Sequence, residues 1–304
     1  MFTFEHLVIM EPSNVSSEMM ETLKKTAKQI TAYDTVPKDD TEILKRIQDA
    51  DGILMSYTSS ISREVLENCP KLHYIGLCCS LYSPESANVD MQAAKELGIT
   101  VTGVREYGDN GVVEFVLYEI IGLFHGYGKH IFESYAKEMT GVKMGIIGLG
   151  DTGRKIAHAL QALEADVCYY SRSRKPEQEA RGIQYLPLHE LLTEAEVVCT
   201  CLNKNVVLLG AEEFAALGEH KLLINTGLSP SYEISAVRKW LKRTGTYLSC
   251  DSDLALGDLT LLDFENVYFK NKASGGTTQA LERLQEKVLE NFFHYLKGKG
   301  GAEA

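Results

Sequence analysis

The sequence of 304 residues lacks the features that define several large protein classes. Positive charge is scarce, because 31 Lys and Arg stand against 42 Asp and Glu and give a formal net charge of −11. Nucleic acids and anionic membrane surfaces attract a positive footprint, so we expect neither as a partner. No apolar run reaches membrane-spanning length, and Glu5 stands where a signal peptide would carry positive charge. These absences favour a cytoplasmic protein that acts on a small molecule.

The seven cysteines contain no Cys-x-x-Cys pair, and their number is odd. This pattern is typical of reduced thiols and not of a disulfide framework. Cys199 and Cys201 would project from the same face of a strand, as two metal ligands do. No His or further Cys lies near them in the sequence to complete a tetrahedral site. We therefore expect buried structural thiols and no metal.

Internal repeats and low-complexity segments are also missing, and short apolar runs alternate with helical patterns instead. Such alternation predicts parallel sheets built from strand–helix–strand units, that is, an α/β fold. The predicted strands are 7–10, 52–56, 74–78, 100–102, 144–148, 166–170, 196–201, 221–225, 247–251 and 267–270. The predicted helices between them are 18–30, 41–50, 63–69, 89–97, 152–163, 188–192, 212–217 and 234–242.

Two longer helices are predicted over 110–125 and 277–297. The first is apolar nearly all round, so most of its faces must be covered by another domain or by a second subunit. We expect a homodimer formed through 110–125. The second helix has apolar residues at helical spacing on one face, which is typical of a helix that packs on a core.

The strongest motif is a glycine-rich turn between a predicted strand and a predicted helix. It reads Gly148-Leu-Gly150-Asp151-Thr152-Gly153 and matches the dinucleotide fingerprint in the context that this fingerprint requires. Gly148 permits the tight turn, Gly150 lets the backbone approach a pyrophosphate, and Gly153 permits close packing of helix on strand. The alternative is a glycine turn without a ligand. We predict that the segment binds the phosphates of a nicotinamide dinucleotide at the helix N-terminus.

The end of the next strand indicates which dinucleotide is preferred. An NAD site usually places Asp or Glu there to bind the ribose 2′-hydroxyl, but the chain has Ser171-Arg172-Ser173-Arg174. Hydroxyl groups and guanidinium forks suit a 2′-phosphate. We therefore predict NADP(H) over NAD(H); the alternative is a solvated basic turn.

The chain as a whole resembles the D-isomer-specific 2-hydroxyacid dehydrogenases. The resemblance rests on Asn88-Val-Asp90, Val112-Val-Glu114, the glycine-rich turn, Leu223-Ile-Asn-Thr226, Asp251 and Gly275-Gly-Thr277. It implies a Rossmann nucleotide-binding domain of residues 101–276, inserted into a flavodoxin-like substrate domain of residues 1–100 plus 277–304. It also implies a cleft between the domains, hydride transfer with NAD(P), and cofactor contacts from Cys201, Leu202, Thr226, Gly227 and Asp251.

The resemblance fails at the three positions that carry the family's chemistry. The Arg that binds the substrate carboxylate is replaced by Leu228, and the Glu that orients the acid/base His is replaced by Leu256. Lys272 occupies the position of the His itself. Reduction of a 2-oxo acid needs a positive group for the carboxylate and a proton donor for the developing alkoxide. Leu228 supplies neither.

Two cations offer a replacement for the missing groups. Arg105 lies where the chain enters the nucleotide domain and is a candidate for binding an acidic substrate; the alternative is a surface Arg paired with Glu106 or Asp109. Lys272 is a candidate proton donor if partial burial or a neighbouring nicotinamide weakens its hold on the proton. Its alternative role is purely structural or electrostatic.

The loop that leads to Asn88 is longer than the short turn of the family. It brings in four side chains with hydroxyl groups, Ser80, Tyr82, Ser83 and Ser86, which indicates a different substrate.

Two functions remain open. One is an oxidoreductase that transfers hydride to or from a small acidic substrate with a non-standard acid/base site. The other is a dinucleotide-binding sensor or regulatory protein without turnover.

Overall fold

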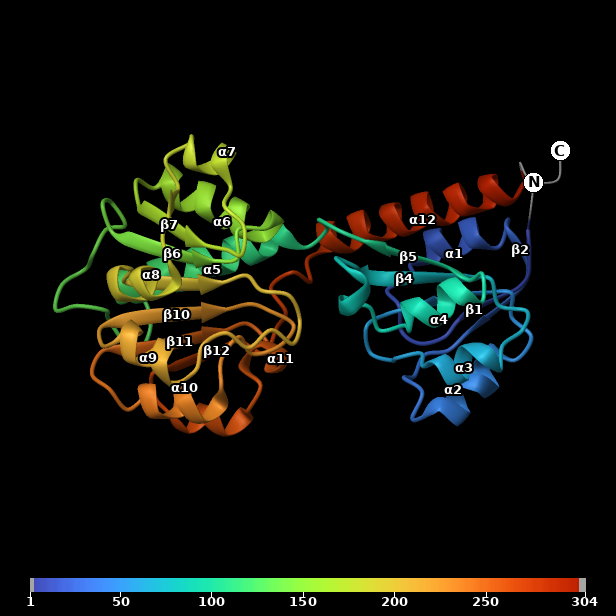
Figure 1. The fold of residues 1–304 in the computed structure, drawn as a ribbon, viewed down its shortest axis with the longest axis horizontal. Helices are drawn as coiled ribbons and strands as arrows, with labels where there is room; N and C mark the ends of the chain where they lie inside the picture. Colours follow the sequence, from blue (N-terminus) through green and yellow to red (C-terminus); the bar gives the residue numbers. More distant parts are fainter. Residues whose placement is uncertain (1–2, 301–304) are drawn as a thin grey trace. The chain divides into compact units, whose positions relative to one another are not determined.

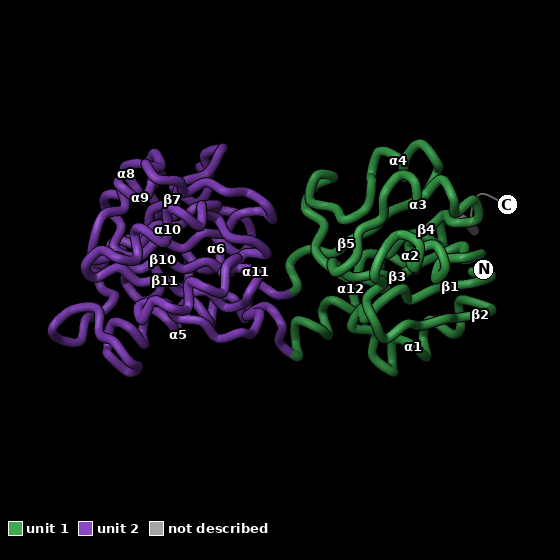
Figure 2. The backbone as a smooth tube through the Cα atoms, turned by 90° about the horizontal axis from the view of Figure 1, so that it is seen from below, with its two compact units in different colours: residues 1–107, 278–304 green, residues 108–277 purple. Residues whose placement is uncertain are grey.

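The computed structural model describes residues 3–300. The chain divides into two compact units, residues 1–107 with 278–304 and residues 108–277 (Figure 2). Both are α/β units with parallel sheets, as the alternation of strands and helices predicts.

The first unit is a flavodoxin-like sheet in the order β2-β1-β3-β4-β5. Its strands are β1 (Phe4–Ile9), β2 (Ala27–Ala32), β3 (Gly52–Met55), β4 (Tyr74–Ser80) and β5 (Thr100–Val104). Helices α1 (Ser17–Leu23) and α12 (Thr278–Gly300) cover one face of the sheet (Figure 1). Helices α2 (Asp40–Ile47), α3 (Arg63–Glu67) and α4 (Met91–Glu96) cover the other, and η1 (Pro84–Ser86) follows β4.

The second unit is a Rossmann sheet in the order β12-β11-β10-β9-β6-β7-β8. Its strands are β6 (Lys143–Ile147), β7 (Asp166–Tyr170), β8 (Gln184–Tyr185), β9 (Val197–Thr200), β10 (Lys221–Asn225), β11 (Thr246–Cys250) and β12 (Val267–Phe269). The strand order reverses between β6 and β9, and ligands of such sheets bind at the carboxyl ends of the strands at this point.

Two layers of helices enclose the second sheet (Figure 1). Helices α5 (Asp109–His125) and α6 (Asp151–Ala162) pack on one face. Helices α8 (Leu188–Glu194), α9 (Ala211–Leu217) and α10 (Ile234–Trp240) pack on the other. Three short helical segments complete the unit, α7 (Pro176–Glu179), α11 (Asp253–Leu256) and η2 (Leu259–Asp263).

The predicted helix over 18–30 is wrong in its second half. The helix ends at Leu23, whose carbonyl oxygen accepts a hydrogen bond from the Thr26 hydroxyl at 2.7 Å. The chain then forms the edge strand β2, in which Phe4 of β1 pairs with Ala27. Ile30 and Thr31 are β-branched and suit a strand better than a helix. A pairing partner distant in sequence thus outweighed the local helical pattern.

The expected start of the nucleotide domain at residue 101 also differs from the structure. Strand β5 pairs with β4, for example through Ile75 and Val101, and therefore belongs to the first sheet. The first unit runs to Tyr107, and the second ends at Thr277. Within residues 3–300, no helix is both long enough and apolar enough to cross a membrane.

Candidate functional site

The glycine-rich turn leads directly into the N-terminus of α6. Its N-cap Gly150 makes no side-chain cap, and a Cβ at Gly150 would meet no atom within 4 Å. Gly148 has a φ of +95°, and a Cβ there would lie 2.4 Å from the carbonyl oxygen of Cys201. A Cβ at Gly153 would lie 2.1 Å from the carbonyl oxygen of Gly148. The turn therefore needs glycine at two positions for its own packing and leaves open space at the third, which fits a dinucleotide pyrophosphate.

The side chains of the first turn of α6 are engaged within the second unit. Asp151 pairs with Arg154 one turn further along the helix. The Thr152 hydroxyl donates to the carboxylate of Asp109, a buried residue at the start of α5, and Lys155 lies 3.3 Å from the same carboxylate. From the sequence, Asp109 is expected only as a partner of Arg105. Nothing in the local sequence indicates its pairing with Thr152.

The turn after β7 carries the residues that are predicted to distinguish the two dinucleotides. The Ser171 hydroxyl donates to the carbonyl oxygen of Ser173 at 2.6 Å. Arg174 forms an ion pair with Glu179 and stacks on the Tyr185 ring at 5.1 Å. Arg172 is exposed and has no ion-pair partner in the described part of the chain. Of the two predicted arginines, Arg172 is therefore the one available to a 2′-phosphate.

Asp251, which is predicted to contact the cofactor, holds the loop that follows β12. Its carboxylate is 3% exposed and accepts hydrogen bonds at 2.7 Å from both the backbone N–H and the hydroxyl of Ser274. Its carbonyl oxygen accepts from the backbone N–H of Lys272 at 2.7 Å. Asn271, next to Lys272, adopts a left-handed φ of +51°.

This arrangement presents the Lys272 side chain to solvent. The partial burial expected for Lys272 is not found within the second unit taken by itself. The other expected effect on Lys272, that of a neighbouring positive nicotinamide, stays a prediction.

The two leucines that the resemblance places in the family's catalytic positions have different surroundings. Leu256, the last residue of α11, is fully buried, whereas Leu228 is 42% exposed. Asn225 joins their loops, because its side-chain amide donates to the carbonyl oxygens of Ser229 and Ala255 at 3.1 and 2.8 Å. The predicted cofactor residues Thr226 and Gly227 lie in the first of these loops, and Leu202 follows Cys201 at the end of β9. Neither leucine can bind a carboxylate or move a proton.

Arg105 follows β5 in the first unit. Its Nε donates to the carbonyl oxygen of Leu81 at 2.9 Å, and its Nη2 donates to that of Tyr82 at 2.6 Å. Within the first unit Arg105 forms no ion pair with Glu106, and its guanidinium holds the loop after β4 instead. The side chain is exposed, so its remaining N–H groups face solvent.

The cysteines are built into the cores of both units. Six are buried, and Cys201 is half-buried. Burial raises the pKa of the Cys168, Cys201 and Cys250 thiols to about 12, so they stay protonated and unreactive at neutral pH. Among residues 3–300, no three His, Cys, Asp or Glu side chains gather closely enough to hold a metal ion.

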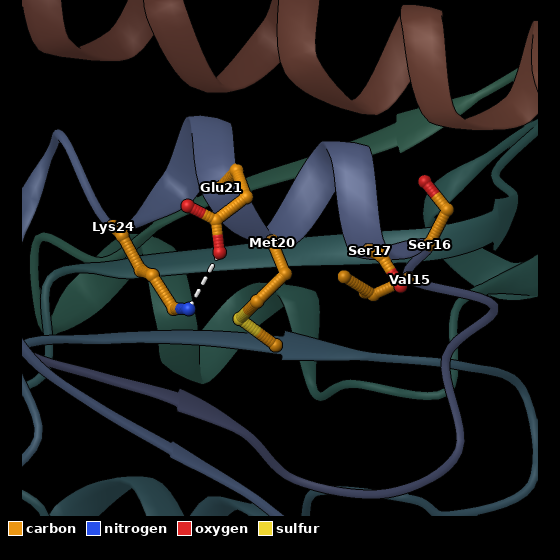
Figure 3. A pocket seen from close by; sticks show the side chains of 6 residues that line it. All are labelled: Val15, Ser16, Ser17, Met20, Glu21 and Lys24. Carbon is orange, nitrogen blue, oxygen red and sulfur yellow. Dashed lines mark hydrogen bonds and ion pairs between the residues drawn. The ribbon is translucent and has the colours of Figure 1, made fainter.

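Two hollows lie apart from the glycine-rich turn. One of about 280 Å³ borders α1 in the first unit, and its charged side chains Glu21 and Lys24 pair with each other at 2.6 Å (Figure 3). The other, of about 190 Å³, lies in the second unit between α5, the segment 127–130 and β12. Three tyrosines line it, Tyr118, Tyr127 and Tyr268. It also contains the buried carboxylate of Glu119, which accepts from the Ser249 hydroxyl at 3.0 Å and lies 3.5 Å from Lys270.

Known proteins of similar sequence are reductases of 2-oxo acids by name. A hydroxypyruvate reductase of Blautia hydrogenotrophica is 26% identical over 283 residues, covering 86% of each chain. A glyoxylate reductase of Thermococcus litoralis is 24% identical over 283 residues, covering 84% of each chain.

Solved structures show the same fold over nearly the whole chain. An acyclic imino acid reductase in complex with NADPH and D-Arg superposes with a TM-score of 0.83 at 19% identity, covering 97% of this chain and 98% of that one. The D-lactate dehydrogenase of Escherichia coli superposes with a TM-score of 0.77 at 20% identity, covering 96% and 97%.

The family model for the D-isomer specific 2-hydroxyacid dehydrogenase catalytic domain matches residues 7–304. The resemblance read from the sequence is thereby confirmed at the level of the family, whose members bind NAD(P). The chain belongs to the D-isomer-specific 2-hydroxyacid dehydrogenases and is an oxidoreductase of the class that acts on CH–OH and C=O groups.

Proposed function

We propose that this protein is an NADP(H)-preferring, cytoplasmic oxidoreductase that reduces the carbonyl group of a small acidic substrate, or oxidises the corresponding alcohol, with a non-standard acid/base site. The observation that carries the proposal is the uncapped N-terminus of α6 beside the open space at Gly150. A nicotinamide dinucleotide, when bound, supplies or accepts the hydride.

Each role in the reaction falls to a named residue of this chain. The first turn of α6 binds the pyrophosphate, and Ser171 with Arg172 binds the 2′-phosphate. Arg105 holds the acid group of the substrate through the N–H groups that the loop after β4 does not use. Lys272 gives its proton to the substrate oxygen in the direction of reduction and takes it back in the direction of oxidation.

A dinucleotide-binding sensor without turnover is the second candidate. It is favoured by Leu228 and Leu256, which stand where the resemblance places two catalytic residues of the family. Leu256 is fully buried in an apolar core, so this position serves packing and not catalysis. In that case dinucleotide binding would change a contact with a partner and no substrate would be consumed.

We further propose that the protein is a homodimer formed through α5. The helix packs on the second sheet through Val116, Ile120 and Leu123, yet Tyr118 on its outer side is 61% exposed. Tyr127 and Tyr135, which follow the helix, are 76% and 85% exposed. Exposed aromatic side chains grouped in this way are typical of an interface between subunits.

The test of the proposed reaction is NADPH oxidation by the full chain with a panel of 2-oxo acids, aldehydes and imines. We expect slow turnover of glyoxylate, pyruvate and hydroxypyruvate and faster turnover of another member of the panel. Lys272→Met should lower that turnover by about two to four orders of magnitude while NADPH binding persists. Lys242→Met, which removes an exposed cation elsewhere in the second unit, is the control and should be silent.

Two results would contradict the proposal, the first for the role of Lys272 and the second for the reaction as a whole. Turnover that Lys272→Met leaves unchanged removes Lys272 from the mechanism. Tight NADPH binding without reduction of any panel member supports the sensor.

A further inference from the structure

Three tyrosines follow the carboxyl ends of three neighbouring strands in the first unit. Tyr57 comes two residues after β3, Tyr82 two residues after β4, and Tyr107 three residues after β5. The carboxyl ends of parallel strands lie at one edge of the sheet, where α/β folds bind their ligands. Tyr57 is 43% exposed and Tyr82 is 37% exposed.

The loop that carries Tyr57 is fixed by buried polar groups. The carboxylate of Glu11, which is fully buried, accepts hydrogen bonds from the backbone N–H of Ser56 at 2.9 Å and from the Ser59 hydroxyl. The Asn88 side-chain amide donates to the carbonyl oxygens of the same two serines at 2.8 and 2.5 Å. Tyr57 is therefore an exposed ring on an ordered backbone.

The loop that carries Tyr82 is equally ordered. The Ser86 hydroxyl oxygen accepts from the backbone N–H groups of Tyr82 and Ser83 at 3.2 and 3.0 Å, and the N–H of Leu81 donates to the carbonyl oxygen of Val104 at 3.0 Å. Three successive N–H groups are thus used within the unit. The loop offers a ligand its side chains, with Arg105 lying 5.9 Å from the centre of the Tyr82 ring.

Tyr107 is the third tyrosine at this edge of the sheet. Its hydroxyl is hydrogen-bonded to Ser80. Burial, together with the neighbouring Cys79, Tyr82 and Tyr57, raises its pKa to about 12, so it stays a hydrogen-bond donor at neutral pH. Its carbonyl oxygen accepts from Arg283 at 2.9 Å. The preceding residue, Glu106, adopts a φ of +55°. This left-handed backbone at a side chain other than Gly, Asn or Asp is a strain that folds retain mainly at functional sites.

We infer that this edge binds the planar aromatic side chain of the substrate, so that the substrate is a 2-oxo acid such as an arylpyruvate and not glyoxylate or pyruvate. The inference rests on the proposed function. Rings held on ordered loops bury a planar group at little cost in side-chain entropy. Arg105, anchored by the same loop, binds the carboxylate with its remaining N–H groups. A substrate without a side chain leaves both rings uncovered.

The test separates binding from chemistry by using an acid that cannot react. The full chain is titrated calorimetrically with 3-phenylpropionate and with propionate, neither of which has a carbonyl group to reduce. We expect 3-phenylpropionate to bind at least about tenfold more tightly. Tyr57→Leu and Tyr82→Leu should each weaken its binding about 5- to 30-fold, whereas Tyr57→Phe and Tyr82→Phe, which keep the rings, should bind as the unmodified protein does. Arg105→Gln should weaken the binding of both acids by similar factors.

Equal affinity for the two acids overturns the inference, and so does a Leu variant that keeps NADPH binding and loses no affinity for 3-phenylpropionate. The proposed function is tested separately with phenylpyruvate and glyoxylate as substrates. Ring-dependent binding without any NADPH oxidation supports the aromatic site and refutes the oxidoreductase. Reduction that depends on Lys272 but is as fast with glyoxylate as with phenylpyruvate supports the oxidoreductase and refutes the aromatic site.

Discussion

The carboxylate of Asp109 accepts a hydrogen bond from the hydroxyl of Thr152, which lies 43 residues further along the chain. The bond joins the first residue of α5 to the first turn of α6, where the dinucleotide phosphates are expected. Lys155, at 3.3 Å, provides the opposing charge for this buried carboxylate. A negative group therefore lies under a helix terminus that attracts anions.

Asp109→Asn should lower stability and tighten dinucleotide binding. The amide still accepts from Thr152, but Lys155 loses its partner, and we expect a loss of about 1 kcal/mol in the free energy of unfolding. The site gains one net positive charge near the phosphates, so NADPH should bind about two- to fivefold more tightly at low salt. Urea unfolding and NADPH titration measure the two effects, with Glu114→Gln, an exposed acid of the same helix, as the control. Weaker binding would instead show that Asp109 acts by holding Thr152 in place.

Cofactor preference should depend on Arg172 more than on Arg174. Arg172→Ala should weaken NADPH binding about tenfold and leave NADH binding unchanged, because only NADPH carries the 2′-phosphate. Arg174→Ala should have a smaller effect, since Glu179 already neutralises that guanidinium. Ser171→Asp should reverse the preference by placing a carboxylate against the phosphate. Fluorescence titration with both nucleotides measures each change, and equal affinities in the unmodified protein would contradict the prediction.

A charge on the outer side of α5 should separate the subunits. Tyr118→Glu places a carboxylate in the proposed interface, where it would lose its hydration without gaining a partner. Sedimentation equilibrium at micromolar concentration should show a dimer for the unmodified protein and a monomer for the variant. Val36→Glu changes a side chain of the first unit that is 44% exposed and should leave the dimer intact. A monomeric unmodified protein would rule out the proposed assembly.

Stability should fall as the pH rises from about 10 to about 12. Burial raises the pKa of Tyr107 to about 12, whereas an unfolded tyrosine ionises near pH 10. In this window the unfolded chain has lost a proton that the folded chain still binds, so the stabilisation present below pH 10 is lost with rising pH. Tyr107→Phe should reduce this loss by about 1 kcal/mol at pH 11, measured by urea unfolding at pH 9 and pH 11. Tyr135→Phe, which changes an exposed ring, should leave this loss of stability unchanged. If Tyr107→Phe lost as much stability between pH 9 and pH 11 as the unmodified protein, Tyr107 would not be its source.

The α/β architecture, the family and the position of the glycine-rich turn could all be predicted from the residues alone. These follow from local patterns, because a buried parallel strand needs a continuous apolar run and a tight turn needs glycine. The run Leu223-Ile224-Asn225 therefore predicts a strand even when the neighbouring strands are unknown. In the same way, a glycine at position 148 is compatible with the positive φ that the turn requires.

Which polar groups meet, by contrast, could be seen only in the folded chain. Arg105 donates to carbonyl oxygens 24 and 23 residues away, and Asp251 accepts from Ser274, 23 residues further on. No periodicity of the chain encodes such pairs, because a side chain has several partners of suitable chemistry and the fold selects among them by distance. For the same reason β2 was predicted as a helix: its conformation depends on pairing with β1, and that pairing exists only in the folded sheet.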